Sequence, residues 1–424
     1  MRKKLVLYLF LAAVLRYFLI ISKFSRIIRN RVEISTPLNS FKRVQEGAYL
    51  YKHGINPYSG DLVHEVPTIL LGLSWVLNNC ECLLPFLFIA LDLLTAFFLY
   101  EMTKMVLRSQ LDQARKAKYA PDTEDIQLKT DDVEPLSHYV MMAYLFNPFS
   151  VASCVAQTTT VFSNFFLSLY FFFLAKKQIT PCMLFLAIET MRSMYPVVLL
   201  APAVLQFSEN SLAKAIKVVN AFLALCGILS FLHYSMIGNW SFFDSTLGFI
   251  FHYRDLQPNI GVFWYFFTEM FEHFRTMFLV TFQMNATILY LVPLSIKLRK
   301  DPMMLATILL ALIAIFRSYP CVGDIAFYLA FLPLWKKCWK FMAQNFIVFC
   351  FFLVTVLVMP TLWHLWIYAG SANANFYFGI TLGFCTGQIF LVTDLLFAHV
   401  KREFCLKNGQ KLFIDGKEAK IILE

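Results

Sequence analysis

Residues 83–107 read LLPFLFIALDLLTAFFLYEMTKMVL, a long run with few charged side chains. A helix needs about 20 mostly apolar residues to cross the roughly 30 Å hydrocarbon core of a bilayer, so this run predicts a transmembrane helix. An earlier run, residues 5–21 (LVLYLFLAAVLRYFLII), follows the basic start Met1-Arg2-Lys3-Lys4. No small-residue cleavage site follows it, so we interpret it as an uncleaved first span whose basic end lies in the cytosol.

Composition extends this prediction to the whole chain. The 424 residues are 59% hydrophobic and 15% charged, whereas soluble domains carry about 25% charged residues. The deficit is spread along the chain, which argues against a soluble domain of any size. The net charge of +10 comes from short basic clusters at the ends of apolar runs, where the positive-inside bias puts them. Membrane topology therefore explains the charge, and nucleic acid is not an expected partner.

The spacing of these clusters predicts the topology. Further apolar runs centre near Tyr144, Leu169, Leu186, Val198, Leu225, Val280, Leu309, Ala330, Val354 and Phe390. Basic clusters follow every second run: Lys176-Lys177, Lys214 with Lys217, Lys297 with Arg299-Lys300, Lys336-Lys337 with Lys340, and Lys401-Arg402. Keeping them cytosolic predicts an all-α polytopic membrane protein with about twelve transmembrane helices and both termini in the cytosol.

We treat residues 1–424 as a single membrane domain. Residues 22–82 are expected to form a lumenal loop in which 66–77 lies at the interface, 108–137 a cytosolic loop, and 400–424 a cytosolic tail. Turn dipeptides at Asn408-Gly409 and Asp415-Gly416 predict a hairpin-like tail. One group of cations, all in the first lumenal loop, does not fit the positive-inside bias: Arg26, Arg29, Arg31, Lys42 and Arg43.

The sequence offers little sign of metal or cofactor chemistry. The ten cysteines form no CxxC pair and no His/Cys spacing suited to zinc. Asp131-Asp132 lies in the charged cytosolic loop, where solvated side chains are the better interpretation than a metal site. We therefore expect neither a metal nor a catalytic residue.

The long loop after the first span resembles that of the lipid-sugar-dependent glycosyltransferases of the endoplasmic reticulum. The segment Gly54-Ile55-Asn56-Pro57-Tyr58 is related to one in the mannosyltransferases that build glycosylphosphatidylinositol (GPI). The resemblance implies a glycosyltransferase-C-like bundle. The Asp-x-Asp motif of those enzymes is missing, and Glu33 stands alone in its place. An active dolichol-sugar-dependent enzyme stays open as an alternative, because Glu33, Glu46 or Asp61 could serve as a base.

Four further blocks sharpen the resemblance to one family: residues 119–122 (YAPD), 259–274 (NIGVFWYFFTEMFEHF), 315–324 (IFRSYPCVGD) and 362–376 (LWHLWIYAGSANANF). They resemble the class U family of phosphatidylinositol-glycan biosynthesis, across nearly the whole chain. The resemblance implies a non-catalytic subunit of the GPI transamidase in the endoplasmic reticulum membrane that binds the GPI lipid or the attachment signal. It implies as partners the caspase-like catalytic class K subunit, the class T and class S subunits, GPI anchor attachment protein 1 and membrane lipids. No cofactor is expected beyond the bound glycolipid and other phospholipids.

The block 362–376 is the candidate lipid-binding segment. Trp363, His364 and Trp366 have amphipathic rings that favour the headgroup level of a membrane. The family places a matching asparagine pair at the GPI headgroup, which implies that role for Asn373 and Asn375. The alternative is an ordinary lumenal turn with an aromatic belt.

Other charged and small residues carry two interpretations each. Arg317 and Asp324 flank a lumenal turn and are expected either to pair with each other or to place Arg317 on a lipid phosphate. Lys297, Arg299 and Lys300 suit acidic headgroups such as cardiolipin, although positive-inside charge also explains them. The GxxxG series Gly379, Gly383 and Gly387 fits helix packing or a lipid chain. A transporter or lipid scramblase is a further alternative for the whole chain.

Overall fold

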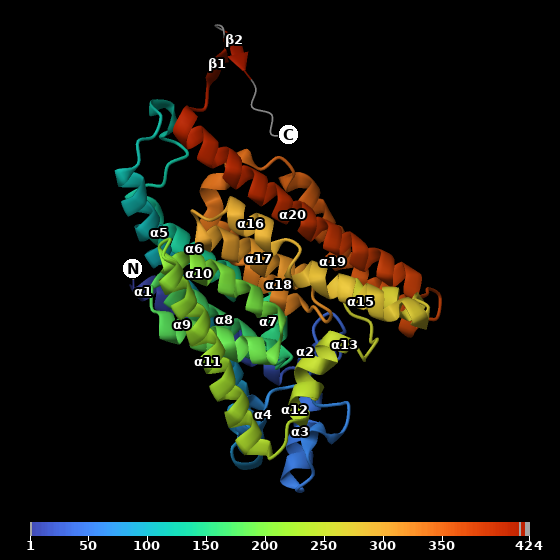
Figure 1. Cartoon of the computed structure of the whole chain (residues 1–424). Helices are drawn as coiled ribbons and strands as arrows, with labels where there is room; N and C mark the ends of the chain where they lie inside the picture. The colour runs from blue at the N-terminus through green and yellow to red at the C-terminus, as the bar shows by residue number, and fades with distance from the viewer. Residues whose placement is uncertain (1, 415–416, 420–424) are drawn as a thin grey trace.

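The structure is a computed structural model that describes residues 2–414 and 417–419. It consists of helices with one small hairpin (Figure 1). The first half contains α1 (Arg2–Ile21), α2 (Phe24–Arg29), α3 (Phe41–Lys52), η1 (Pro57–Ser59), α4 (Pro67–Asn79), η2 (Glu81–Leu83), α5 (Leu84–Lys116), η3 (Pro121–Thr123), η4 (Thr130–Asp132), α6 (Val133–Leu145), α7 (Pro148–Val155), α8 (Thr160–Ala175), α9 (Ile179–Arg192), η5 (Tyr195–Leu199), α10 (Leu200–Ser208) and α11 (Leu212–Ile237).

The second half contains α12 (Ser241–Phe243), η6 (Asp244–Gly248), α13 (Phe249–His252), α14 (Phe263–Glu269), α15 (Glu272–Thr287), α16 (Leu291–Lys297), α17 (Pro302–Phe316), α18 (Val322–Leu329), η7 (Leu332–Phe341), α19 (Asn345–Ile367) and α20 (Ala374–Asn408). Strands β1 (Leu412–Ile414) and β2 (Lys417–Ala419) pair antiparallel, which confirms the hairpin predicted for the tail. The Asp415-Gly416 turn lies outside the described residues.

The all-α prediction is confirmed, but the structure does not reproduce twelve long spans. Within the described residues, six helical stretches are long and apolar enough to cross a membrane: Lys3–Ile21, Glu81–Lys116, Leu212–Ile237, Glu272–Lys297, Asn345–Ile367 and Ala374–Asn408. Other apolar runs form shorter helices, such as Thr160–Ala175, Tyr195–Ser208 and Pro302–Phe316. Proline at the first turns of α7, η5 and α17 explains several of these breaks, because proline lacks the N–H that a continuing helix needs.

A buried ion pair ties α1 to α5 at the centre of the bundle. The Arg16 guanidinium donates to Asp92 at 2.5 Å and to the Leu145 carbonyl at 2.9 Å. Tyr144 on α6 donates to the other oxygen of Asp92 at 2.7 Å. Arg16 and Asp92 are 0% and 1% exposed. Asp394 on α20 is also paired, since it accepts from the backbone N–H groups of Ala343 and Gln344.

Helices α19 and α20 pack as a close antiparallel pair along one side of the bundle (Figure 1). A side chain on Gly387 would place Cβ 2.7 Å from Cβ of Phe351, and one on Gly383 would meet Thr355 at 3.4 Å. A side chain on Gly379 would meet no atom within 4 Å. Helix packing therefore explains Gly383 and Gly387, whereas Gly379 lies outside the contact.

Gly387→Leu is expected to destabilise the protein, because the new side chain would force α19 and α20 apart. Overpacking of this kind costs about 1–3 kcal/mol. Thermal unfolding of the detergent-purified protein measures the loss. Gly379→Leu, on the same helix but in open space, is the matched control and should unfold near the wild-type temperature. Equal melting temperatures for the two variants would contradict the packing.

The segment expected as the first lumenal loop folds into a compact cap, residues 24–83, at the lower end of the view in Figure 1. Phe41, Val44, Tyr58 and Leu70 are buried in its core, which continues onto Phe88 of α5. Residues 67–77 of the expected interfacial segment lie in α4, which packs against α3 and α11, and Val66 is the N-cap of that helix.

At the other end of the molecule, residues 119–126 hold the end of α20 in a clasp. Asp122 accepts from the backbone N–H groups of Gln410 (2.6 Å) and Lys411 (3.1 Å). The Ala120 N–H donates to the Leu406 carbonyl at 3.1 Å. The two backbone amides lower the pKa of Asp122, so this carboxylate stays ionised at neutral pH. α20 therefore runs as one helix from the α19–α20 turn to the clasp.

Candidate functional site

The turn between α19 and α20 carries an aromatic cluster, which we call the rim: Trp264, Trp363, Trp366 and Tyr377. The Tyr377 ring centroid lies 5.1 Å from that of Trp363 and 6.1 Å from those of Trp366 and Trp264. Trp264 stacks on Trp366 at 6.1 Å. Two residues predicted from sequence, Trp363 and Trp366, therefore lie together, and α14 contributes a third tryptophan to them.

The predicted asparagines lie at the start of α20, beside the rim. Asn373 is the N-cap of α20, and its side-chain oxygen accepts from the Phe376 N–H at 3.4 Å. Asn375 is exposed, as are His364 and its ring neighbour Tyr368. Gly370 adopts a φ of +63°, which favours glycine at this turn. The exposed amide groups at this tip have donors available to a ligand.

Sequence reasoning missed a polar contact that joins this tip to the cap. The Tyr377 hydroxyl donates to Glu33 Oε1 at 3.2 Å. Arg31 donates to both oxygens of the same carboxylate, at 2.7 and 3.0 Å, and the Val322 N–H donates to the Glu33 carbonyl. Glu33 and Tyr377 are 344 positions apart, so no local pattern predicts this contact. The only available signal was the group of cations in the first loop that does not fit the positive-inside bias.

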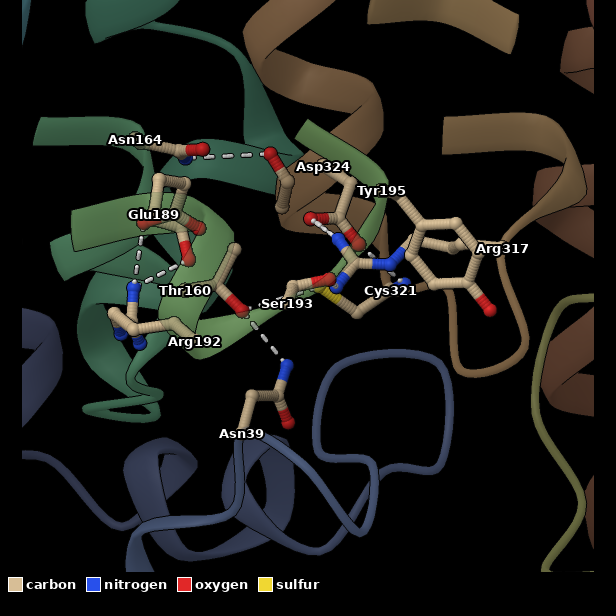
Figure 2. A network of polar contacts seen from close by, with 12 residues as sticks. Asn39, Thr160, Asn164, Glu189, Arg192, Ser193, Tyr195, Arg317, Cys321 and Asp324 are labelled. Atoms are coloured by element: carbon tan, nitrogen blue, oxygen red, sulfur yellow. Dashed lines mark hydrogen bonds and ion pairs between the residues drawn. The ribbon is translucent and has the colours of Figure 1, made fainter. Parts of the chain in front are cut away.

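Arg317 and Asp324 lie in a separate buried network (Figure 2). Arg317 donates to Asp324 at 2.6 Å and to the Ser193 hydroxyl at 3.3 Å, so the pairing interpretation is confirmed. The other Asp324 oxygen accepts from the Cys321 N–H at the start of α18. No hydrogen bond among the described residues links this pair to Asn373 or Asn375. The contact of Arg317 with a lipid phosphate stays a prediction.

A second buried cluster was not predicted. Arg192 at the end of α9 donates to both oxygens of Glu65 at 2.8 Å and to Glu189 at 3.1 Å. The three side chains are 5%, 4% and 3% exposed. Figure 2 shows Arg192 and Glu189 beside Asn164 and Thr160. The spacing of Glu189 and Arg192 inside an apolar run was the available signal, because isolated charge in such a run needs a partner.

His64 of the cap lies beside this cluster and is neutral. Burial lowers its pKa to about 4, against the opposing hydrogen bond to the Ser245 carbonyl. Its ring stacks on Phe249 at 3.5 Å. Two cavities adjoin the buried networks, of about 30 and 20 Å³. Each has room for about one water molecule and is far too small for a sugar.

A cavity of about 740 Å³ lies near the clasp. Lys297, Arg299 and Lys300 line it, which brings the predicted acidic-lipid residues together at one place. The end of α20 adds Arg402 and Lys407, and Gln206 of α10 lines another wall. The surplus of cations favours an anionic occupant.

No three His, Cys, Asp or Glu side chains gather as a metal site within the part of the chain that the structure describes. Glu269 ends α14 and His273 lies in the first turn of α15, and both are exposed.

Comparison with known proteins gives a consistent family. A model described as "GPI transamidase subunit PIG-U" matches residues 10–384. A protein of Homo sapiens named GPI-anchor transamidase component PIGU is 37% identical over 440 residues, which cover 100% of both chains. Its Cricetulus griseus counterpart is 38% identical over the same length. GPI transamidase component GAB1 of Saccharomyces cerevisiae is 28% identical over 376 residues, 88% of each chain. The chain therefore belongs to the GPI transamidase subunit PIG-U family.

Proposed function

We propose that this protein is a non-catalytic subunit of the GPI transamidase in the endoplasmic reticulum membrane and that it binds the GPI lipid. The observation that carries the proposal is the tip of the α19–α20 pair, where Asn373 and Asn375 are exposed beside the aromatic rim. Its relatives are named as components of that transamidase. The attachment signal is a second ligand that the same tip would meet on the lumenal side.

The tip suits a glycolipid headgroup for three reasons. The half-buried indole rings of Trp363 and Trp366 favour the depth of lipid headgroups and would meet a sugar, whereas Trp264 and Tyr377 are buried and pack behind them. The asparagine amides donate to sugar or phosphate oxygens. Exposed apolar side chains on α19, among them Phe349, Leu353 and Leu357, continue from the tip toward the clasp and would lie beside the acyl chains.

In this proposal the chemistry belongs to other subunits. The caspase-like class K subunit cleaves the attachment signal, and the class T and class S subunits and GPI anchor attachment protein 1 complete the complex. The present chain presents the glycolipid to them at the lumenal surface. About twelve crossings in a glycosyltransferase-C-like arrangement, with both termini cytosolic, complete the proposal. In that arrangement, two consecutive short helices with a break between them make one crossing of the membrane.

Replacing both asparagines by alanine is expected to lower GPI attachment while the complex still assembles. Each hydrogen bond contributes about 0.5–1.5 kcal/mol, so losing both weakens lipid binding by roughly 5- to 150-fold. Surface display of a GPI-anchored reporter in cells that lack the wild-type protein measures the effect, and affinity purification reports on assembly.

Two controls separate lipid binding from folding. Asn373→Ser keeps a side-chain oxygen to cap α20 but loses the amide donors, so its attachment defect should persist when it is combined with Asn375→Ala. Asn220→Ala, an exposed asparagine on α11, should behave as wild type. Full reporter display in the double alanine variant would rule out the assignment of Asn373 and Asn375.

The glycosyltransferase alternative is less well supported. Glu33, which stands where those enzymes carry their acidic motif, is bound by Arg31 and Tyr377 and is not free to act as a base. Asp61 lies 3.7 Å from Arg254 on the exposed side of the cap. Mannose transfer by the purified protein, abolished by Glu33→Gln, would restore this alternative. Solute or lipid flux in liposomes would do the same for a transporter.

The cavity near the clasp extends the proposal to acidic phospholipids. Lys297, Arg299 and Lys300 line it on the side where the chain is expected to meet the cytosolic leaflet. Each cation near a membrane surface adds about 1 kcal/mol of attraction to anionic lipid. The two phosphates of a lipid such as cardiolipin would meet the surplus of cations that line this cavity.

A further inference from the structure

The cations of the first loop contradict the positive-inside bias, and the structure gives contacts for all of them except Arg26, which is exposed. Arg29 donates to the Gln157 side chain in the α7–α8 turn and lies over the Phe41 ring of the cap. Arg43 pairs with Asp255 at 2.7 Å. Lys42 is exposed and donates to Asn30 at 2.6 Å. Arg29 and Arg43 therefore join the cap to the α7–α8 turn and to the segment after α13, whereas the contact of Lys42 lies within the cap.

Arg31 is different because it reaches the candidate site. Its Nη2 and the Tyr377 hydroxyl both donate to the same oxygen, Glu33 Oε1, at 2.7 and 3.2 Å. Tyr377 is a member of the rim and lies two positions after Asn375. Glu33 Oε1 therefore links the guanidinium to Tyr377, whose ring packs on Trp363.

The arrangement also orients the guanidinium. Glu33 takes up Nε and Nη2 in a bidentate contact, and Nη1 makes no hydrogen bond to the residues that the structure describes. Arg31 keeps 22% of its side chain exposed, whereas Glu33 keeps 9%. A planar guanidinium held along one edge by a carboxylate presents its other edge in a fixed direction, which suits phosphate oxygens.

From this geometry we propose that Arg31 binds a phosphate ester of the lipid held at the rim and that Glu33 and Tyr377 position it. The proposal rests on the proposed function and names the part of the ligand that the asparagines and aromatic rings leave uncovered. A phosphatidylinositol-based glycolipid carries a phosphodiester between its glycan and its acyl chains. That phosphate belongs at headgroup depth, beside the rim. An ordinary phospholipid carries the same group, so the experiment must tell the two apart.

The test uses the intact complex, purified in mild detergent, and measures the co-purified lipids by mass spectrometry. Arg31→Gln alone would leave the buried Glu33 without its partner and destabilise the fold, so the decisive variant is Arg31→Gln with Glu33→Gln. This pair keeps the net charge and removes the cation; Glu33→Gln keeps the side-chain size, and Arg31→Gln shortens it. We expect its glycolipid content per complex to fall roughly ten-fold, the effect of one charge-assisted hydrogen bond.

Two further variants serve as comparisons for the neutral pair. Lys42→Gln removes an exposed cation from the same cap and should keep wild-type glycolipid content. Arg31→Lys keeps the charge but not the bidentate geometry, and should fall between wild type and the neutral pair.

Each possible result supports or overturns the role of Arg31 or the proposed function. Wild-type glycolipid content in the neutral pair, with loss in the asparagine double variant, would overturn the role of Arg31 and leave the proposed function standing. Loss of a phospholipid alone would assign Arg31 to membrane lipid and overturn its role in glycolipid binding. Absence of glycolipid from the wild-type complex would overturn both proposals.

Discussion

Arg192→Met is expected to be among the most destabilising single substitutions in this protein. The guanidinium satisfies both carboxylates, Glu65 of the cap and Glu189 of α9, at 2.8–3.1 Å. It also donates to the Ser163 hydroxyl and the Thr159 carbonyl. Removing it leaves two buried carboxylates without a cation, and breaking a buried ion pair costs about 3–5 kcal/mol. That is a large share of a typical folding stability of about 5–15 kcal/mol.

Thermal unfolding of the purified protein and its steady-state level in cells measure this loss. Arg115→Met is the matched control, because its pair with Asp112 is 68% and 69% exposed and surface pairs contribute about 0–1 kcal/mol. Adding Glu65→Gln and Glu189→Gln to Arg192→Met should restore part of the stability, because no buried charge is then left unpaired. An Arg192→Met protein as stable as the Arg115→Met control would show that the cluster does not hold the cap on the bundle.

Arg16→Met should have an effect of similar size by the same mechanism. Arg16 and Asp92 are almost completely buried, and the loss of Arg16 would leave Asp92 with only the Tyr144 hydroxyl. We expect a cost of about 3–5 kcal/mol, with α1 detached from α5. Protease protection of the N-terminal helix and the yield of folded protein from membranes report on this change.

The matched experiment is the apolar pair Arg16→Met with Asp92→Leu. Replacing a buried ion pair by apolar residues of similar volume is often neutral or stabilising, so the double variant should recover most of the lost stability. Continued instability of the double variant would indicate a further role for this pair. Stability of Arg16→Met alone would contradict the ion pair itself.

Long apolar runs predicted the helices well because a membrane helix is specified locally. Residues 5–21 and 83–107 lie in α1 and α5, and the aromatic block 362–376 forms the end of α19, the turn and the start of α20. The ends of the helices were harder to predict. α5 continues to Lys116, nine residues beyond the apolar run, because Gln, Arg and Lys are good helix formers in water.

The polar contacts that join distant segments could not be predicted. Glu65 and Arg192 are 127 positions apart, and Glu33 and Tyr377 are 344 apart. Neither pair leaves a periodic pattern, since each depends on how helices pack in three dimensions. The aromatic and asparagine residues of the tip were found because they are neighbours in sequence. The sequence singled out Arg31 only as a cation in the expected lumenal loop, where the positive-inside bias disfavours it.

α20 is a single helix of 35 residues, and at about 1.5 Å per residue it is roughly 50 Å long. One end carries Asn373 beside the rim, and the other end carries Arg402 and Lys407 in the large cavity. Gly387 presses against α19 between these two ends. The helix therefore spans the distance between the lipid-facing tip and the cationic cavity in one unbroken segment, so the separation of those two places is set by the length of α20.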